Sequence, residues 1–177
     1  GALSPQQNRT AEVARLREQM GAKKAEAEAI GSLARAPGAY FQGRALQILG
    51  RNQEALRELR LAWNLGLRTP AAAQALGSVL LEVYLEDSQR LIGGPSQQES
   101  DRRILAHKYL HPAVAFFQRA AEAGDRKHLY EAQVAFIEGR DEDALALANA
   151  ELATTPWTIE AYHLRHLVWA NRASQAQ

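Results

Sequence analysis

The stretch AYFQGRALQILGRNQEALRELRLAWNLGLRTP, residues 39–70, decides the fold. Its first half carries an apolar stripe at helical spacing, formed by Ala45, Leu46 and Leu49. Gly50 follows, and glycine is the residue best suited to the left-handed conformation that ends many helices. The pattern therefore predicts a helix that closes in a tight turn.

The second half of the stretch predicts a second helix that folds back on the first. Ala55, Leu59 and Ala62 share one face at spacings of four and three. Gly66 and Pro70 should stop this helix, because neither residue favours a helix interior. Two short helices bury little apolar area alone, so the unit needs similar neighbours in order to be stable.

The rest of the chain supplies such neighbours at a regular spacing. Gly77 follows Gly43 by 34 residues, and both are expected to lie where two helices approach closely. Ala132 follows Gly43 by 89 residues, which is 21 more than two periods of 34. The repeated structural positions are Gly43, Gly50, Ala55, Gly77, Ala113, Ala132, Gly139, Ala144 and Pro156.

With this period, turn glycine and small-residue spacing, residues 36–172 resemble the tetratricopeptide repeat (TPR). The resemblance implies an all-α solenoid of antiparallel helix pairs with an enlarged second repeat. The alternating pattern of a strand is not found, so we also expect no sheet. The predicted repeats are residues 36–69, residues 70–124 with a 21-residue insertion, residues 125–158, and a final helix at 159–172.

Residues 4–35 are predicted to form a separate N-terminal helix, with Ser4 as its cap. A narrow apolar stripe runs along it and is interrupted at Lys23. It is either a coiled-coil or linker helix that joins another domain, or a helix that caps the first repeat. We favour the cap, because a coiled coil sustains several clean heptads. Ala36-Pro37-Gly38 should break the chain before the first repeat.

The 21-residue insertion lies between Tyr84 and Pro112 and predicts a projecting helical hairpin. The outgoing helix should run from Pro70 to about Ile92, and Gly93-Gly94-Pro95 should form the turn. Ser96, with Glu99 three residues later, should cap the return helix, and Pro112 should kink or restart it. The apolar residues expected to face one another across the hairpin are Leu85, Leu91 and Ile92 on one side and Ile104, Leu105 and Leu110 on the other.

Composition and motifs give no sign of chemistry. The 177 residues include 21 basic and 20 acidic ones and no cysteine, so there is no thiolate metal site and no reason to expect nucleic acid as a partner. His107 and His111 have the spacing of two metal ligands, but no third ligand has diagnostic spacing. We expect no catalytic residue, no metal, no cofactor, no membrane insertion and a cytoplasmic location.

The candidate binding surface is the inner face of the expected superhelix, which the first helix of each repeat would line. A protein or peptide ligand is the expected partner, and the projecting hairpin is a competing contact site. Helical phase places aromatic, amide and basic side chains toward the groove. They are Tyr40, Arg44, Gln47, Gln74, Ser78, Arg126, Leu129, Gln133, Phe136 and His163.

A finer resemblance rests on the order of the repeats. PGAYFQGRALQILGRNQEALRELRLAWNLGLRTPAAAQALGSVL comes first, the insertion and HPAVAFFQRAAEAG follow, and YEAQVAFIEGRDEDALALANAELATTPWTIEAY comes last. This order is similar to the C-terminal TPR region of bacterial eukaryotic-like serine/threonine protein kinases, over residues 30–172. The resemblance implies a regulatory or docking region whose partner includes a kinase domain of the same polypeptide. A stand-alone TPR adaptor or assembly subunit is the alternative, and an enzyme fits the sequence least.

Overall fold

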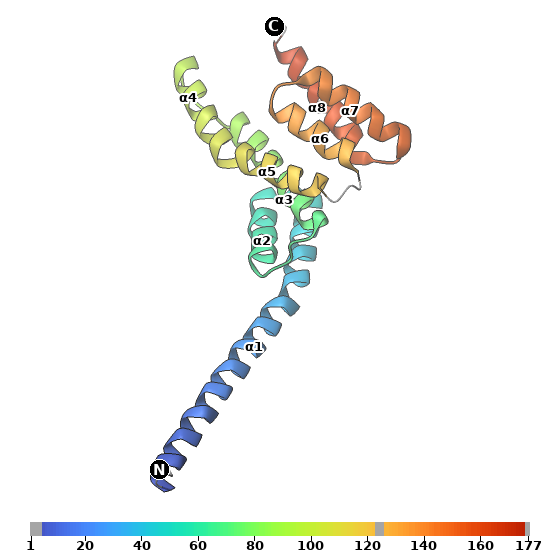
Figure 1. Cartoon of the computed structure of the whole chain (residues 1–177). Helices are drawn as coiled ribbons and strands as arrows, with labels where there is room; N and C mark the ends of the chain where they lie inside the picture. Colours follow the sequence, from blue (N-terminus) through green and yellow to red (C-terminus); the bar gives the residue numbers. More distant parts are fainter. Residues whose placement is uncertain (1–4, 123–125, 176–177) are drawn as a thin grey trace.

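The computed structural model describes residues 5–122 and 126–175, and these residues are helical almost throughout (Figure 1). Among them there is no strand, so the all-α prediction is confirmed. None of these helices is both long and apolar enough to cross a membrane. The elements are α1 (Pro5–Ile48), α2 (Asn52–Asn64), α3 (Pro70–Gln89), α4 (Pro95–Leu105), the π-helical turn η1 (Ala106–Leu110), α5 (His111–Ala121), α6 (Lys127–Ile137), α7 (Asp141–Thr154) and α8 (Ile159–Gln175).

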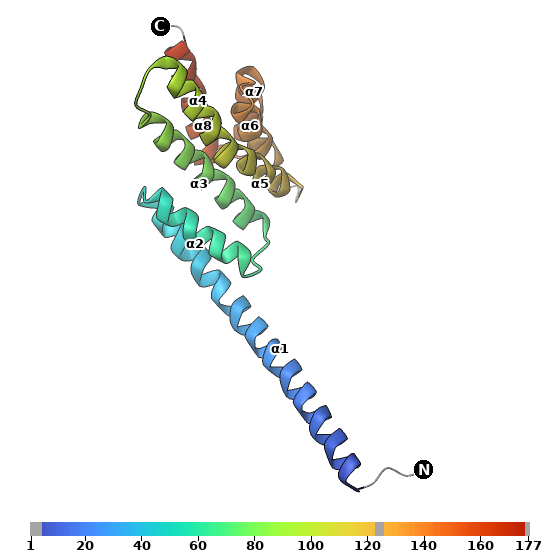
Figure 2. The same cartoon turned by 90° about the vertical axis from the view of Figure 1, so that its left-hand side faces the viewer.

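Each helix packs mainly on its neighbours in the chain. α1 contacts α2, α2 contacts α3, and α3 contacts α5 beyond the hairpin (Figure 2). The contacts then continue from α5 to α6, from α6 to α7 and from α7 to α8. The largest core cluster joins α2, α3, α5 and α6 and includes Ala161 of α8, and two smaller clusters of mostly small residues join α6, α7 and α8. The core is therefore a series of interfaces between successive helices.

Two glycines let these helices approach closely. A Cβ atom built on Gly43 of α1 would lie 2.7 Å from Cγ of Leu59 on α2. A Cβ atom built on Gly77 of α3 would lie 2.6 Å from Cε1 of Phe117 on α5. Real Cβ contacts are not this short, so a side chain at either position would force the Leu59 or Phe117 side chain, or the helices themselves, to shift.

The turns that end α1 and α6 are two copies of one motif, as the sequence predicted. Gly50 and Gly139 both have a positive φ, 71° and 73°. After Gly50, the N–H of Arg51 donates to the carbonyl of Leu46 at 2.9 Å, and the corresponding distance after Gly139 is 2.8 Å. This six-residue hydrogen bond around a left-handed glycine is the Schellman motif, which satisfies carbonyls at the end of a helix.

The 34-residue period also occurs in side-chain contacts between helices. The Nδ2 atom of Asn52, at the start of α2, donates to Oε1 of Glu86 on α3 at 2.7 Å. Arg126, just before α6, donates to Oε2 of Glu160 on α8 at 3.1 Å. Both contacts join residues 34 positions apart, so the spacing of the predicted repeat recurs in contacts of α2 with α3 and of the start of α6 with α8.

The predicted break at Ala36-Pro37-Gly38 is wrong, because α1 continues through it as one helix of 44 residues. A proline removes one internal hydrogen bond, and here the small residues on either side of it, Ala36 and Ala39, are buried and keep the axis in place. Every described side chain from Glu18 to Arg35 is exposed, and this part of α1 projects away from the other helices (Figure 1). It therefore does not lie over the first helix pair as a cap. Ser4 lies outside the described residues.

The hairpin exists, but its turn differs from the prediction. α3 ends at Gln89, and Gly94 rather than Ser96 is the residue that precedes α4. Pro95 occupies the first helical position, where its missing N–H costs no hydrogen bond, and this fixes an earlier start. The side chain of Gln98 donates to the carbonyl of Gly93 at 2.9 Å and closes the turn.

The predicted apolar contact across the hairpin is also wrong at its tip. Ile92 is 90% exposed and Ile104 is 62% exposed, and no residue of α4 is buried. Nearer the core, Leu105 does pack against the main cluster. The tip extends beyond the neighbouring helices, so nothing covers these side chains. The predicted change at Pro112 is confirmed, because the turn Ala106–Leu110 is π-helical and α5 begins at His111, immediately before the proline.

The glycine contacts lead to a stability prediction. Gly77→Leu should lower the free energy of unfolding by about 1–3 kcal/mol or more, because the new side chain overlaps the ring of Phe117. Gly38→Leu is the matched control, since Gly38 is also helical but a Cβ atom placed there would meet no atom within 4 Å. The control should be neutral or stabilising, because leucine has the higher helix propensity. Thermal unfolding followed by circular dichroism measures both, and equal melting temperatures would contradict the close contact.

Candidate functional site

A groove of about 550 Å³ opens where α1, α3, α6 and α8 come together. Six of the ten residues that helical phase placed on the inner face line it. They are Arg44, Gln47, Gln74, Ser78, Gln133 and His163. Residues from four helices far apart in the chain therefore share one concave surface, which we call the groove.

Sequence reasoning missed the other half of the lining. The missed residues are Ile48, Leu81, Glu82, Ile159, Glu160, Leu164 and Leu167. Their helical phase was a usable signal, because Leu81 and Glu82 lie three and four residues after Ser78 on α3. On α8, Ile159, Glu160 and Leu167 lie three or four residues from His163 in the same way.

Four predicted groove residues lie elsewhere. Leu129 has no exposed surface and belongs to the core, so it cannot contact a partner. Tyr40 packs against the main core cluster, and Phe136 packs against the small clusters of α6, α7 and α8. Arg126 is held in ion pairs with two glutamates and does not line the cavity.

The floor of the groove is formed by polar side chains that are nearly buried. Gln74 and Gln133 are 8% and 6% exposed. The Nε2 atom of Gln74 donates to Oγ of Ser78 at 3.2 Å. The Oε1 atom of Gln133 accepts no hydrogen bond from any described residue. A buried carboxamide oxygen without a donor is costly, so this floor favours a ligand or water that donates to it.

Charged side chains lie on the rim. Arg44 donates to Oε1 of Gln47 at 2.8 Å, and no described carboxylate forms an ion pair with it. Burial raises the pKa of Glu160, but hydrogen bonds from its own backbone and from Arg126, together with the charge of Arg44, hold the pKa below its ordinary value. Glu160 is therefore a fixed negative charge at neutral pH, opposite the positive charge of Arg44.

A second acidic group faces the groove from α3. Burial raises the pKa of Glu82, the nearby His163 opposes this shift, and Glu86 adds to it. The Nε2 atom of His163 lies 3.7 Å from Oε1 of Glu82. The two side chains thus form a contact across the groove between a partly buried carboxyl and an imidazole.

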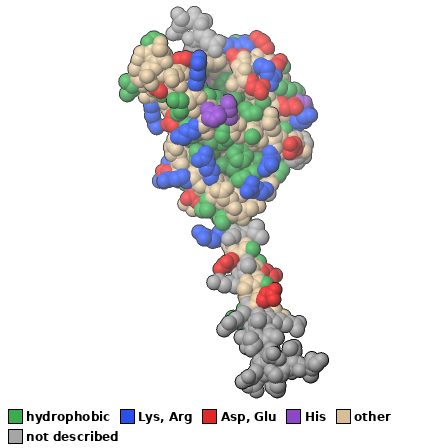
Figure 3. Space-filling model, turned by 60° about the vertical axis from the view of Figure 1, so that its left-hand side comes forward, with side chains coloured by type: hydrophobic (Ala, Val, Ile, Leu, Met, Phe, Trp, Pro, Cys, Tyr) green, Lys and Arg blue, Asp and Glu red, His purple; other side chains and the backbone are tan. Residues whose placement is uncertain are grey.

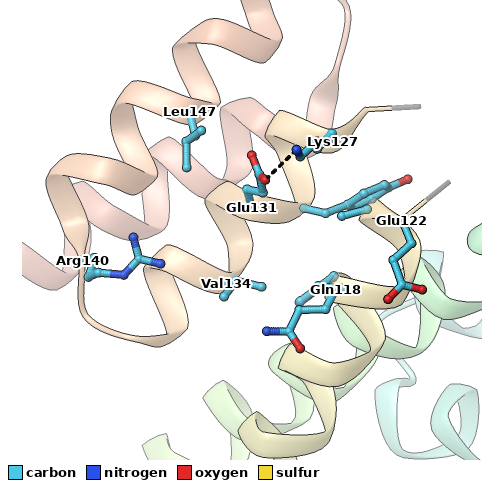
Figure 4. Close-up of a pocket in the computed structure, with 10 residues that line it drawn as sticks. Gln118, Glu122, Lys127, Glu131, Val134, Arg140 and Leu147 are labelled. Atoms are coloured by element: carbon cyan, nitrogen blue, oxygen red, sulfur yellow. Dashed lines mark ion pairs between the residues drawn. The ribbon is translucent and has the colours of Figure 1, made fainter. Parts of the chain in front are cut away.

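A larger cavity, of about 780 Å³, lies between α5, α6 and α7 (Figure 4). Gln118 and Glu122 reach it from α5, and Val134 from α6, while Lys127 and Glu131 pair with each other at 3.5 Å. Arg140, at its edge, is held by hydrogen bonds from its guanidinium to Glu138 and Asp143. Its basic groups are thus already neutralised by neighbours, and we do not favour it as the binding site.

Metal chemistry gains no support from the histidines. The rings of His107 and His111 lie edge to face with centroids 4.9 Å apart. Within the described ranges there is no group of three or more His, Cys, Asp or Glu residues that could hold a metal ion.

The raised pKa of Glu82 gives a pH prediction. A carboxyl with a raised pKa stabilises the fold at low pH and loses that contribution as the pH rises through its folded value. Glu82→Gln should therefore raise the melting temperature at pH 7, and the difference from the unchanged protein should disappear at acid pH. Glu26→Gln, at an exposed position of α1, is the control and should show no such pH dependence. A Glu82→Gln protein that is less stable at pH 7 would show that its contact with His163 outweighs burial.

No family model, curated protein or solved structure matches this chain. Membership of the TPR family and the link to kinases therefore remain predictions from the residues themselves.

Proposed function

We propose that this chain is a non-catalytic protein-interaction module, built as a TPR-like solenoid, whose groove binds an extended segment of a partner protein. The observation that carries the proposal is the groove itself. It gathers predicted residues from α1, α3, α6 and α8 on one concave surface. Ligand sites of repeat proteins lie on such surfaces, because stacking aligns equivalent positions of successive units.

Three features support the solenoid part of the proposal. Helices pack on their neighbours in the chain, as expected of stacked repeats. Side-chain contacts join residues 34 positions apart. The alanines at the repeated positions, Ala55, Ala113, Ala132 and Ala144, are fully buried.

The chemistry of the groove suits an extended peptide. A carboxamide offers a donor and an acceptor, so Gln74 and Gln133 match the N–H and C=O groups of a peptide backbone. Ile48 and Ile159 are 80% and 78% exposed at the rim and can cover apolar side chains of a ligand. Arg44 can bind a carboxylate, because its guanidinium forms no ion pair with a described acid.

The wider setting is a further part of the proposal. Over residues 30–172 the sequence resembles the TPR region of bacterial serine/threonine kinases, so we propose regulation or docking of such a kinase as the biological role. This part is supported by the order of the repeats and the insertion in the sequence.

The groove is tested with peptides selected on the whole chain. A displayed library of random peptides is panned against it, and the enriched peptides are synthesised with a fluorescent label. Dissociation constants are measured by fluorescence anisotropy. Arg44→Glu combined with Ser78→Tyr should weaken binding by about tenfold or more, since one change reverses the rim charge and the other fills the groove.

The matched control is Arg90→Glu combined with Ser100→Tyr, which makes the same two changes at exposed positions of the hairpin. It should leave binding unchanged. Loss of binding in the control with normal binding in the groove variant would place the site on the hairpin. A library that yields no binding peptide would contradict the proposed function.

A further inference from the structure

A second surface, on the side of the molecule that carries α2 and α5, combines aromatic and basic side chains. Figure 3 brings the left-hand side of Figure 1 forward and shows a hydrophobic area surrounded by Lys and Arg side chains, with histidine beside it. We call this surface the basic face. Its residues are Trp63, Arg68, Phe116 and Arg119.

Trp63 holds the basic face together. Its ring packs edge to face against Phe116 of α5, with centroids 5.0 Å apart. The guanidinium carbon of Arg68 lies 4.5 Å from the centre of the same ring, and that of Arg119 lies 5.5 Å from it. One buried indole thus orders two arginines that belong to different helical units.

The positive charge of this face is not neutralised. Arg68 and Arg119 form no ion pair with any carboxylate in the described parts of the chain. Several other arginines are paired, as in Arg103 with Glu99 and Arg140 with Asp143. The net charge of +1 therefore conceals a local excess of positive charge on one side of the molecule.

We propose that the basic face binds an acidic segment of a partner protein. Guanidinium groups bind carboxylates through two parallel hydrogen bonds, and groups that are already ordered lose little entropy on binding. Phe116 and the neighbouring Ala115 supply apolar surface between the charges. This surface lies on helices other than those that line the groove, so the two surfaces can be occupied together.

A nucleic acid fits the face less well than an acidic protein segment. Single-stranded nucleic acids bind through aromatic rings on which the bases stack. Trp63 is only 8% exposed, and its ring is already covered by Arg68, Arg119 and Phe116. The face therefore offers charge and apolar surface, but no open indole on which a base could stack.

The test uses a labelled synthetic peptide of alternating acidic and apolar residues, with fluorescence anisotropy as the measurement. The whole chain should bind it, and the affinity should fall as salt is added. Arg68→Glu with Arg119→Glu should weaken binding at least about tenfold. Arg90→Glu with Arg103→Glu changes the net charge by the same amount on the hairpin and should have little effect.

Arg68→Lys with Arg119→Lys keeps the positive charge but removes the planar guanidinium groups, which can bind a carboxylate through two hydrogen bonds. This variant should weaken peptide binding a few-fold. If the charge-reversed protein does not fold, the lysine variant tests the proposal in its place. Equal binding by both charge-reversed proteins would overturn the proposal, since the attraction would then be non-specific. Absence of peptide binding, or tighter binding of single-stranded DNA or of phosphatidylserine vesicles than of the peptide, would also overturn it.

Discussion

The close approach of helices at two glycines determines the shape of this molecule. At Gly43 and Gly77 there is no room for a methyl group, because Leu59 and Phe117 occupy the space that it would take. Leu59 and Phe117 are themselves fully buried, so each glycine receives a large side chain from the next helix. The two contacts fix α1 against α2 and α3 against α5, and the residues that follow these glycines or precede them on α1 and α3, Arg44, Gln47, Gln74 and Ser78, line one groove.

Features that depend on local spacing could be predicted from the sequence. Glycine often ends a helix because it adopts a positive φ without steric strain, and Gly50 and Gly139 both have a positive φ. Features that depend on the balance between two opposing local preferences could not be predicted from the sequence. Pro37 removes one hydrogen bond, yet α1 continues through it, and Ala36 and Ala39 beside it are buried. Ser96 is a good cap, yet Pro95 fixes the helix start before it.

For the candidate site, the sequence predicted which side of a helix faces the groove, but not how deeply each residue is buried. Helical phase identifies which side of a helix faces the groove, and six residues were found in this way. Phase cannot say how deeply a neighbouring helix covers a position, and Leu129 is therefore in the core. The basic face was missed because composition reports a total charge, whereas Arg68 and Arg119 acquire their common position only when α2 packs beside α5.

Packing between successive helices has a consequence for folding. When most contacts join segments that are near in the chain, little loop entropy must be lost before they form, and such topologies fold quickly. Opening should also be graded, because removing α8 breaks its contacts with α6, α7 and Glu82 of α3 but leaves the interfaces among the other helices intact. Amide hydrogens of α8 should then exchange faster than those of α3, whose interior residues Leu76, Val79 and Leu80 are fully buried. The chain can in this way loosen at its end while the helices that line most of the groove keep their places.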